Sequence, residues 1–131
     1  MNELEKKRLL KSAFKSLKNE KSFFGSPVTG GEIQELFPSD LIDIKEGPHE
    51  TVILKMQQGD YYQIPSVKDP DEFFGQFSGF VKVSSEGAVN VSKITRIDPL
   101  NRLIWCEGKN FKVENDYWDN LIREYNKHSR Q

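Results

Sequence analysis

The sequence predicts a mostly β fold with a helix at each end and a short helix in the middle. Many short apolar segments are separated by Gly, Pro, Asn and Asp residues, which is typical of strands joined by turns. Apolar side chains follow helical spacing only near the two termini. Because 36% of the 131 residues are apolar, the chain can bury a core. We therefore expect stacked antiparallel sheets with helical additions.

The N-terminal segment is typical of a basic amphipathic helix over residues 3–22. Leu10, Phe14 and Leu17 recur at helical spacing, and lysines occupy much of the remaining surface. The Gly-Ser-Pro sequence at residues 25–27 ends the pattern. An apolar stripe of this kind most often packs on protein, so we expect docking on the sheet or on a second copy, ahead of phosphate contacts or a membrane surface.

Strands and turns follow this helix. Gly30-Gly31 predicts a tight two-residue hairpin turn, because glycine adopts the positive φ angles that such turns need. Residues 57–60 and 107–110 predict two further hairpin turns. Strands are expected at residues 41–44, 51–56, 61–64, 80–83, 89–91, 102–106 and 111–113.

Two later helices have recognisable start signals. Asp69 is the expected cap of a short central helix, with Pro70 at its first position and Glu72 at the capping-box position. Its expected apolar side consists of Phe73, Phe74 and Phe77. Asn115 is the expected cap of the C-terminal helix, and acids in the first turn favour the helix N-terminus. Its expected apolar face consists of Tyr117, Leu121, Ile122 and Tyr125.

Charge is unevenly distributed along the chain. Residues 1–26 carry seven Lys or Arg against three Glu, whereas residues 27–90 carry four lysines against eleven acids. Residues 91–131 carry eight basic against six acidic residues. The formal net charge of −1 is therefore the sum of a basic N-terminal segment, an acidic middle segment and a mildly basic C-terminal segment.

Several classes of protein are not indicated by the sequence. The single cysteine, Cys106, excludes an internal disulfide and fits a reducing, cytoplasmic compartment. No Cys/His cluster has metal-ligand spacing, and no glycine-rich phosphate loop is present, so no cofactor is expected. Ser84-Ser85 has no neighbouring histidine to activate it, and we expect no catalysis. Lysines interrupt the apolar residues at the N-terminus, so neither a signal peptide nor a membrane span is expected.

Residues 80–94 contain an ordered set of aromatic, basic, apolar and amide residues, namely Phe80, Lys82, Val83, Val89, Asn90 and Ile94. In this order and without a gap, they resemble the signature segment of the LytTR family of DNA-binding domains. The resemblance continues through Arg96-Ile97-Asp98 and Arg102-Leu103-Ile104-Trp105 to Val113, and upstream to Gly30-Gly31. It covers residues 28–126, so we divide the chain into the helical segment 1–26 and a LytTR-like domain at 27–131.

The resemblance implies both a fold and a function. LytTR domains are the DNA-binding output modules of many bacterial response regulators, and they place loops of an elongated stack of sheets into successive DNA grooves. Carried over by position, the three contact loops are residues 46–51, 84–86 and 114–117. The implied protein is a non-enzymatic, stand-alone, cytoplasmic transcription regulator that binds double-stranded DNA as a homodimer.

Nine residues are the candidates for DNA contact. They are His49, Lys82, Ser84, Ser85, Lys93, Arg96, Arg102, Lys109 and Asn115. The polar side chains would reach base edges, and the cations would contact phosphates. For the serines and Asn115 the alternative is turn and cap chemistry, and for each lysine it is simple solvation. Lys82 alternates with two valines and is expected to point outward.

The predicted contact loops depart from the family pattern by carrying acids. Residues 84–86 read Ser-Ser-Glu, residues 114–116 read Glu-Asn-Asp, and the first loop has glutamates on both sides of His49. An acid that faces phosphate repels it, although it can accept a hydrogen bond from cytosine. The alternative hypothesis is therefore a LytTR-like module that binds a partner protein, such as a true regulator, through the N-terminal helix and the acidic middle.

Overall fold

The computed structural model describes residues 2–18, 22–75 and 79–129, with the side chains of 11–18 left out. Within these residues there are three α-helices, ten strands and two short 3₁₀ turns. The helices are α1 (Glu3–Lys18), α2 (Pro70–Gly75) and α3 (Asn115–Ser129), and the 3₁₀ turns are η1 (Pro38–Asp40) and η2 (Val91–Lys93). The strands are β1 (Phe23–Pro27), β2 (Gln34–Leu36), β3 (Leu41–Glu46), β4 (Val52–Met56), β5 (Tyr61–Ile64), β6 (Phe80–Ser84), β7 (Gly87–Asn90), β8 (Ile94–Asp98), β9 (Leu103–Cys106) and β10 (Lys109–Lys112).

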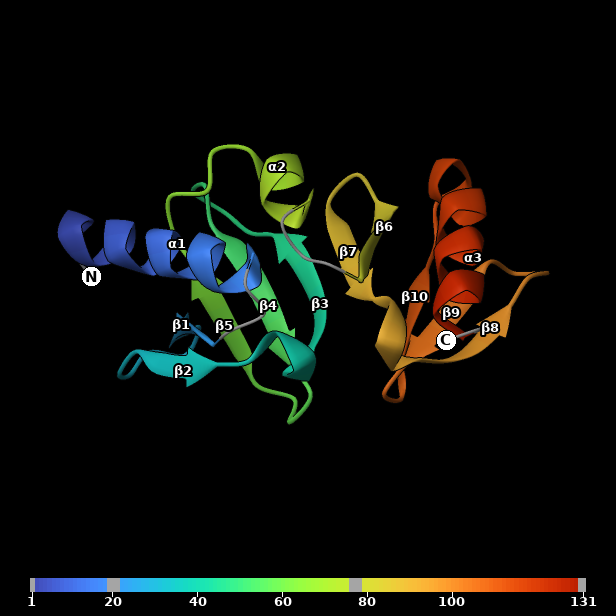
Figure 1. Cartoon of the computed structure of the whole chain (residues 1–131), viewed down its shortest axis with the longest axis horizontal. Helices are drawn as coiled ribbons and strands as arrows, with labels where there is room; N and C mark the ends of the chain where they lie inside the picture. Colours follow the sequence, from blue (N-terminus) through green and yellow to red (C-terminus); the bar gives the residue numbers. More distant parts are fainter. Residues whose placement is uncertain (1, 19–21, 76–78, 130–131) are drawn as a thin grey trace.

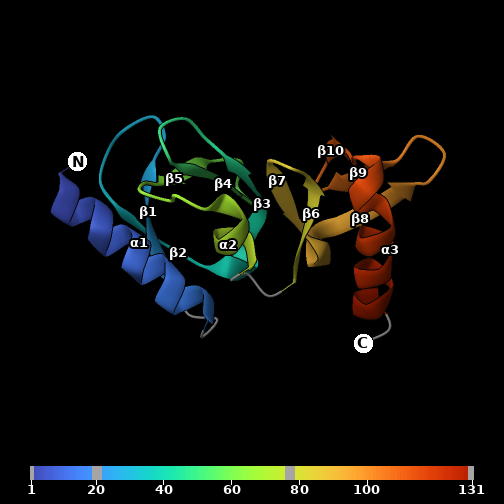
Figure 2. The same cartoon turned by 90° about the horizontal axis from the view of Figure 1, so that it is seen from above.

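The strands form two antiparallel sheets in an elongated molecule. The larger sheet has seven strands in the order β2-β1-β5-β4-β3-β7-β6, and the smaller has the order β10-β9-β8. Helices α1 and α2 lie at the end of the molecule formed by β1 to β5, while α3 lies with the small sheet at the other end (Figures 1 and 2). The β6–β7 hairpin lies between these two ends. The prediction of stacked antiparallel sheets with three helices is confirmed.

Two hydrophobic cores hold this arrangement together, one on each face of the large sheet. The first core includes Phe23, Leu54 and Phe73, with Leu10 of α1 packed against it. The second core includes Ile42, Val89, Ile104, Val113 and Leu121, and it joins the large sheet to the small sheet and α3. The small sheet and α3 therefore cover the face of β3 and β7 that is turned away from α1 and α2.

A β-bulge in β3 controls which side chains face the second core. The register shifts between Leu41 and Asp43, so Ile42 is the extra residue. As a result Leu41 and Ile44 both belong to the first core, whereas Ile42 belongs to the second. Asp43 pairs across the sheet with Val89 of the second core. The bulge thus buries a carboxylate on the side that faces the small sheet.

The predicted hairpin at Gly30-Gly31 is wider than expected. Both glycines have positive φ, but the paired strands are β1 and β2, and the last pair toward the turn is Gly25 with Gln34. The physical reason is that β1 leaves β2 after Gly25. Its last two residues pair with β5 instead, which leaves a long connection in place of a two-residue turn.

Other predicted boundaries also need correction. Helix α1 is described as far as Lys18, and Ser22, the last residue of the predicted helix 3–22, lies outside a helix, while residues 19–21 lie outside the described residues. The predicted turn at 107–110 contains only Glu107 and Gly108, because both have positive φ and close a two-residue turn. Val91 begins a 3₁₀ turn and does not extend β7. The division of the chain at residue 27 stays a prediction, although β1 crosses it.

Two local predictions about α2 are confirmed, one by a hydrogen bond and one by burial. Asp69 caps α2, because its Oδ1 accepts from the backbone N–H of Glu72 at 3.2 Å. Phe73 and Phe74 are buried as expected, while Phe77 lies outside the described residues. On the described part of the chain, no helix combines the length and the hydropathy needed to span a lipid bilayer.

Candidate nucleic-acid interface

Backbone hydrogen bonds connect the three loops that the sequence predicts for DNA contact. The N–H of Glu46 donates to the carbonyl of Glu86 at 2.8 Å, which joins the first loop to the second. The N–H of Glu114 donates to the carbonyl of Val83 at 2.9 Å, which joins the third loop to the strand before the second. In Figure 1 all three lie toward the upper side of the molecule. We call residues 46–51, 84–86 and 114–117 the contact edge.

The first loop of the contact edge is a tight turn in an unfavourable backbone conformation. His49 and Glu50 have φ of 55° and 57°, and the N–H of Thr51 donates to the carbonyl of Pro48 at 3.2 Å. Two successive positive φ values suit the right-handed twist of a hairpin, but they are costly for residues other than glycine. His49 is exposed in this turn, where its ring can meet a partner.

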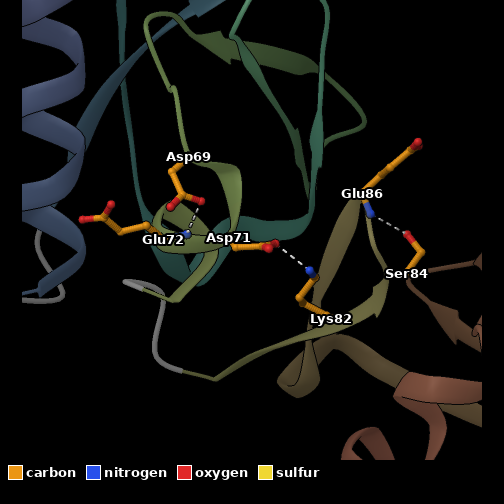
Figure 3. Close-up of polar contacts among 6 residues, drawn as sticks. All are labelled: Asp69, Asp71, Glu72, Lys82, Ser84 and Glu86. Atoms are coloured by element: carbon orange, nitrogen blue, oxygen red, sulfur yellow. Dashed lines mark hydrogen bonds and ion pairs between the residues drawn. The ribbon is translucent and has the colours of Figure 1, made fainter.

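The second loop is organised by turn chemistry. Ser84 Oγ accepts from the N–H of Glu86 at 3.1 Å (Figure 3). Ser85 is exposed. Lys82 precedes this loop on β6, and its Nζ lies 2.5 Å from Asp71 Oδ1 of α2 and 5.3 Å from the ring centre of Tyr117. Lys82 lies on the face of β6 opposite to the buried Val81 and Val83, as the alternation predicts, but its ammonium group is held between α2 and α3.

These contacts stabilise the charged form of Lys82. Partial burial works against its charged form, but the hydrogen bond and the charge of Asp71, with a further contribution from Tyr117, raise its pKa above the ordinary value. Lys82 is therefore a cation whose charge is already matched by a neighbouring acid.

The third loop brings together two candidate residues from different elements. The guanidinium of Arg102 donates to Asn115 Oδ1, and Arg102 itself has a positive φ of 54°. Asn115 is the first residue of α3, so the predicted cap at this position is wrong by one residue. Its side-chain oxygen is directed at Arg102 across the loop.

The exposed charge of the contact edge is mainly negative. Its exposed acids are Glu46, Glu50, Glu86, Glu114 and Asp116. The only described lysine or arginine in direct contact with a contact-edge side chain, apart from Lys82, is Arg102. Phosphate contacts at this edge therefore have to overcome repulsion.

Three of the nine candidate residues lie away from the contact edge. Lys93 of η2 donates to Gln57 Oε1 at 2.8 Å, in the turn between β4 and β5. The guanidinium of Arg96 lies 4.4 Å from the ring centre of Trp105, on strands of the small sheet. Lys109 begins β10, and its Nζ lies 3.6 Å from Asp43 Oδ2. The structure thus brings together His49, Lys82, Ser84, Ser85, Arg102 and Asn115, but not these three.

A second group of charged residues was missed by the sequence reasoning. The ammonium nitrogens of Lys45, Lys55 and Lys109 lie 5.9, 5.8 and 5.9 Å from the ring centre of Tyr61. We call these three lysines the lysine cluster. Lys45 and Lys55 alternate with apolar residues in the sequence, which indicates strands but gives no sign that the two converge with Lys109.

Asp43 lies beside the lysine cluster. Its Oδ2 has no hydrogen-bond partner among the described residues, since 3.6 Å to Lys109 is an ion-pair distance too long for a hydrogen bond. Burial raises the pKa of Asp43, and the positive charges of Lys109, Lys55 and Lys45 only partly counter this effect.

The described residues hold no group of three or more potential metal ligands. Cys106 is buried in the second core, and burial, with the negative charges of Asp43 and Glu107, raises its pKa to about 12. A thiol with this pKa is a poor nucleophile at neutral pH.

Neither the known protein families nor the curated proteins include a match to this sequence. Among solved structures, the chain is similar to the LytTr DNA-binding domain of a response regulator from Bacillus cereus, with a TM-score of 0.64. The match covers 79% of this chain and 94% of that domain, at 14% sequence identity. The chain therefore has the LytTR-type fold that its signature segment predicts.

Proposed function

We propose that the chain is a DNA-binding transcription regulator of the LytTR type that contacts duplex DNA through the contact edge. The observation that carries this proposal is the pair of backbone hydrogen bonds that place the three loops side by side. An extended row of loops suits successive grooves of a duplex, because base edges are accessible only there. His49, Ser84, Ser85, Arg102 and Asn115 are the proposed contact residues, and catalysis is not part of the proposal.

The proposal extends to the oligomeric state and the cellular location of the protein. We propose a stand-alone homodimer on a repeated DNA site in the bacterial cytoplasm, because two half-sites multiply the affinity of a domain with few cations. Light scattering with and without DNA tests this directly: a monomer in the bound complex contradicts it.

The main test is a mobility-shift assay with a salt titration on fragments of genomic DNA. Arg102→Gln should weaken binding by about tenfold and reduce the salt slope by about one, because it removes one cation from the contact edge. Arg123→Gln is the matched control, since Arg123 lies on the exposed side of α3 and bonds only to Asn120 among described residues. An affinity that does not depend on salt, or equal losses in both variants, contradicts the proposal.

A second candidate function is favoured by the five exposed acids of the contact edge. In this alternative the same edge binds a basic surface of a partner protein, and acids repel DNA. The salt titration separates the two, because a protein-binding module without phosphate contacts shows no salt-dependent DNA binding. A pull-down from a bacterial cell lysate, with Glu86→Gln and Glu114→Gln as weakened variants, would then identify the partner.

A further inference from the structure

The lysine cluster and the hollow beside it form a second surface, distinct from the contact edge. Three ammonium groups from β3, β4 and β10 meet around one tyrosine ring, although their strands belong to two different sheets. Because each lies within 5.9 Å of the same ring centre, no two are further apart than twice that distance. Like charges within this range repel one another, and an anion that binds among them reduces this repulsion.

Asp43 supplies only part of the negative charge that this arrangement needs. One carboxylate offsets one of the three positive charges, and only Lys109 is within ion-pair distance of it. Lys45 and Lys55 form no ion pair with a described residue. The cluster therefore keeps an excess of positive charge even when Asp43 is ionised.

A groove of about 840 Å³ adjoins the cluster, between the β1–β2 connection and the β4–β5 hairpin. Lys45 and Tyr61 belong both to the cluster and to the wall of this groove. Val28, Ile53 and Tyr62 make other parts of the wall apolar. A volume of this size is typical of small-molecule sites, which combine apolar walls with a few polar anchors. Glu46 and Asp60 also line the groove, so an anionic group fits only at its lysine end.

We propose that this surface is a binding site for a phosphoryl group, with Lys45, Lys55 and Lys109 as its ligands. Lysine binds phosphate as a point charge with three donors, so three lysines can share the oxygens of one group. The phosphoryl group belongs either to a small organic phosphate whose body occupies the groove or to the backbone of a nucleic acid that passes over the cluster. Tyr61 is 38% exposed, so the part of its ring that the three lysines leave uncovered can contact the remainder of either ligand.

The test uses the full chain and two probes, inorganic pyrophosphate and a short DNA duplex at low salt. Titration calorimetry should detect pyrophosphate binding to the wild type, and the triple variant Lys45→Gln, Lys55→Gln, Lys109→Gln should weaken it by at least about tenfold. The matched control is the triple variant Lys7→Gln, Lys68→Gln, Lys127→Gln, which removes the same charge from exposed positions elsewhere. Its affinity should remain within about twofold of the wild type.

A single variant keeps the proposal testable if the triple variant is destabilised. Lys109 faces buried Asp43, so its replacement can destabilise the protein, whereas Lys45 is exposed and Lys45→Gln should lower pyrophosphate affinity with an unchanged melting temperature. If only duplex binding falls in the cluster variants, the phosphoryl group is that of a nucleic acid. If neither probe distinguishes the cluster variant from its control, the proposal is overturned. Arg102→Gln should leave pyrophosphate binding intact, so failure of the DNA function is seen separately.

Discussion

The contact edge and the lysine cluster are neighbours in the fold, but their unpaired charges have opposite signs. Lys45 directly precedes the first loop of the contact edge. At the edge, acids are exposed and the nearby cations have partners, since Lys82 is paired with Asp71 and Arg102 with Asn115. At the cluster, cations outnumber the acid, and two of them have no ion-pair partner among the described residues. The backbone thus fixes where a partner can lie, while side-chain charge decides which partner is attracted.

Reversing the charge of the contact edge should have the largest effect. The triple variant Glu46→Lys, Glu86→Lys, Glu114→Lys removes three repulsions and adds three cations beside the proposed DNA path. We expect affinity for a duplex to rise by about tenfold to a hundredfold at low salt, with a salt slope steeper by up to about three. A mobility-shift assay across salt concentrations measures both quantities.

The control for this reversal has the same change in net charge at other exposed positions, Glu3→Lys, Glu32→Lys and Asp119→Lys. If the control gains as much affinity as the edge variant, net charge alone drives binding. The contact edge would then not be the DNA-binding surface.

Breaking the Asp43–Lys109 pair should have the next largest effect, and it acts on stability. Lys109→Met leaves a buried carboxylate without its nearest positive charge, so we expect a loss of about 1–2 kcal/mol in the free energy of unfolding. Lys45→Met removes a more exposed charge of the same cluster and should cost less than about 0.5 kcal/mol. Urea unfolding of both variants tests the difference, and equal losses would show that the pair has no special role.

The dependence of stability on pH should reveal the buried carboxylate itself. Asp43 has a raised pKa in the folded state, so the folded protein binds a proton more tightly at this residue than the unfolded chain does. The contribution of Asp43 to stability should therefore fall as pH rises from the ordinary value of 3.8 through the raised folded pKa. Asp43→Asn should abolish this part of the profile in urea unfolding, and parallel wild-type and variant profiles would contradict it.

Much of the fold could be predicted from the sequence, because its signals are local. The capping carboxylate of Asp69, the turn at 57–60 and the signature segment all depend on neighbours along the chain. Within the signature segment, Asn90 ties two stretches of backbone together, since its Nδ2 donates to the carbonyl of Leu41 at 2.9 Å. The wide β1–β2 connection was missed because it depends on the pairing of β1 with distant β5.

The sites were harder to predict, because they depend on contacts between distant segments. Nothing in the sequence around Lys82 indicates that Asp71 of α2 faces it. The bulge at Ile42 turns Asp43 toward Lys109, which lies on a different sheet. The direction of a long side chain is set by the elements packed above it, and alternation along one strand does not contain that information.

The smallest effect on DNA affinity is expected for changes at Lys82. They test whether Lys82 stays paired with Asp71 or contacts phosphate when DNA binds. Its ammonium group is already paired with Asp71 at 2.5 Å, so Lys82→Gln should change DNA affinity by less than about twofold. Asp71→Asn releases the same cation and should increase both the affinity and the salt slope slightly. The measurement is the shift assay used for Arg102→Gln, run in parallel. A loss at Lys82→Gln as large as that at Arg102→Gln would mean that Lys82 exchanges Asp71 for phosphate on binding, and that the acids near this edge act as partners which DNA displaces.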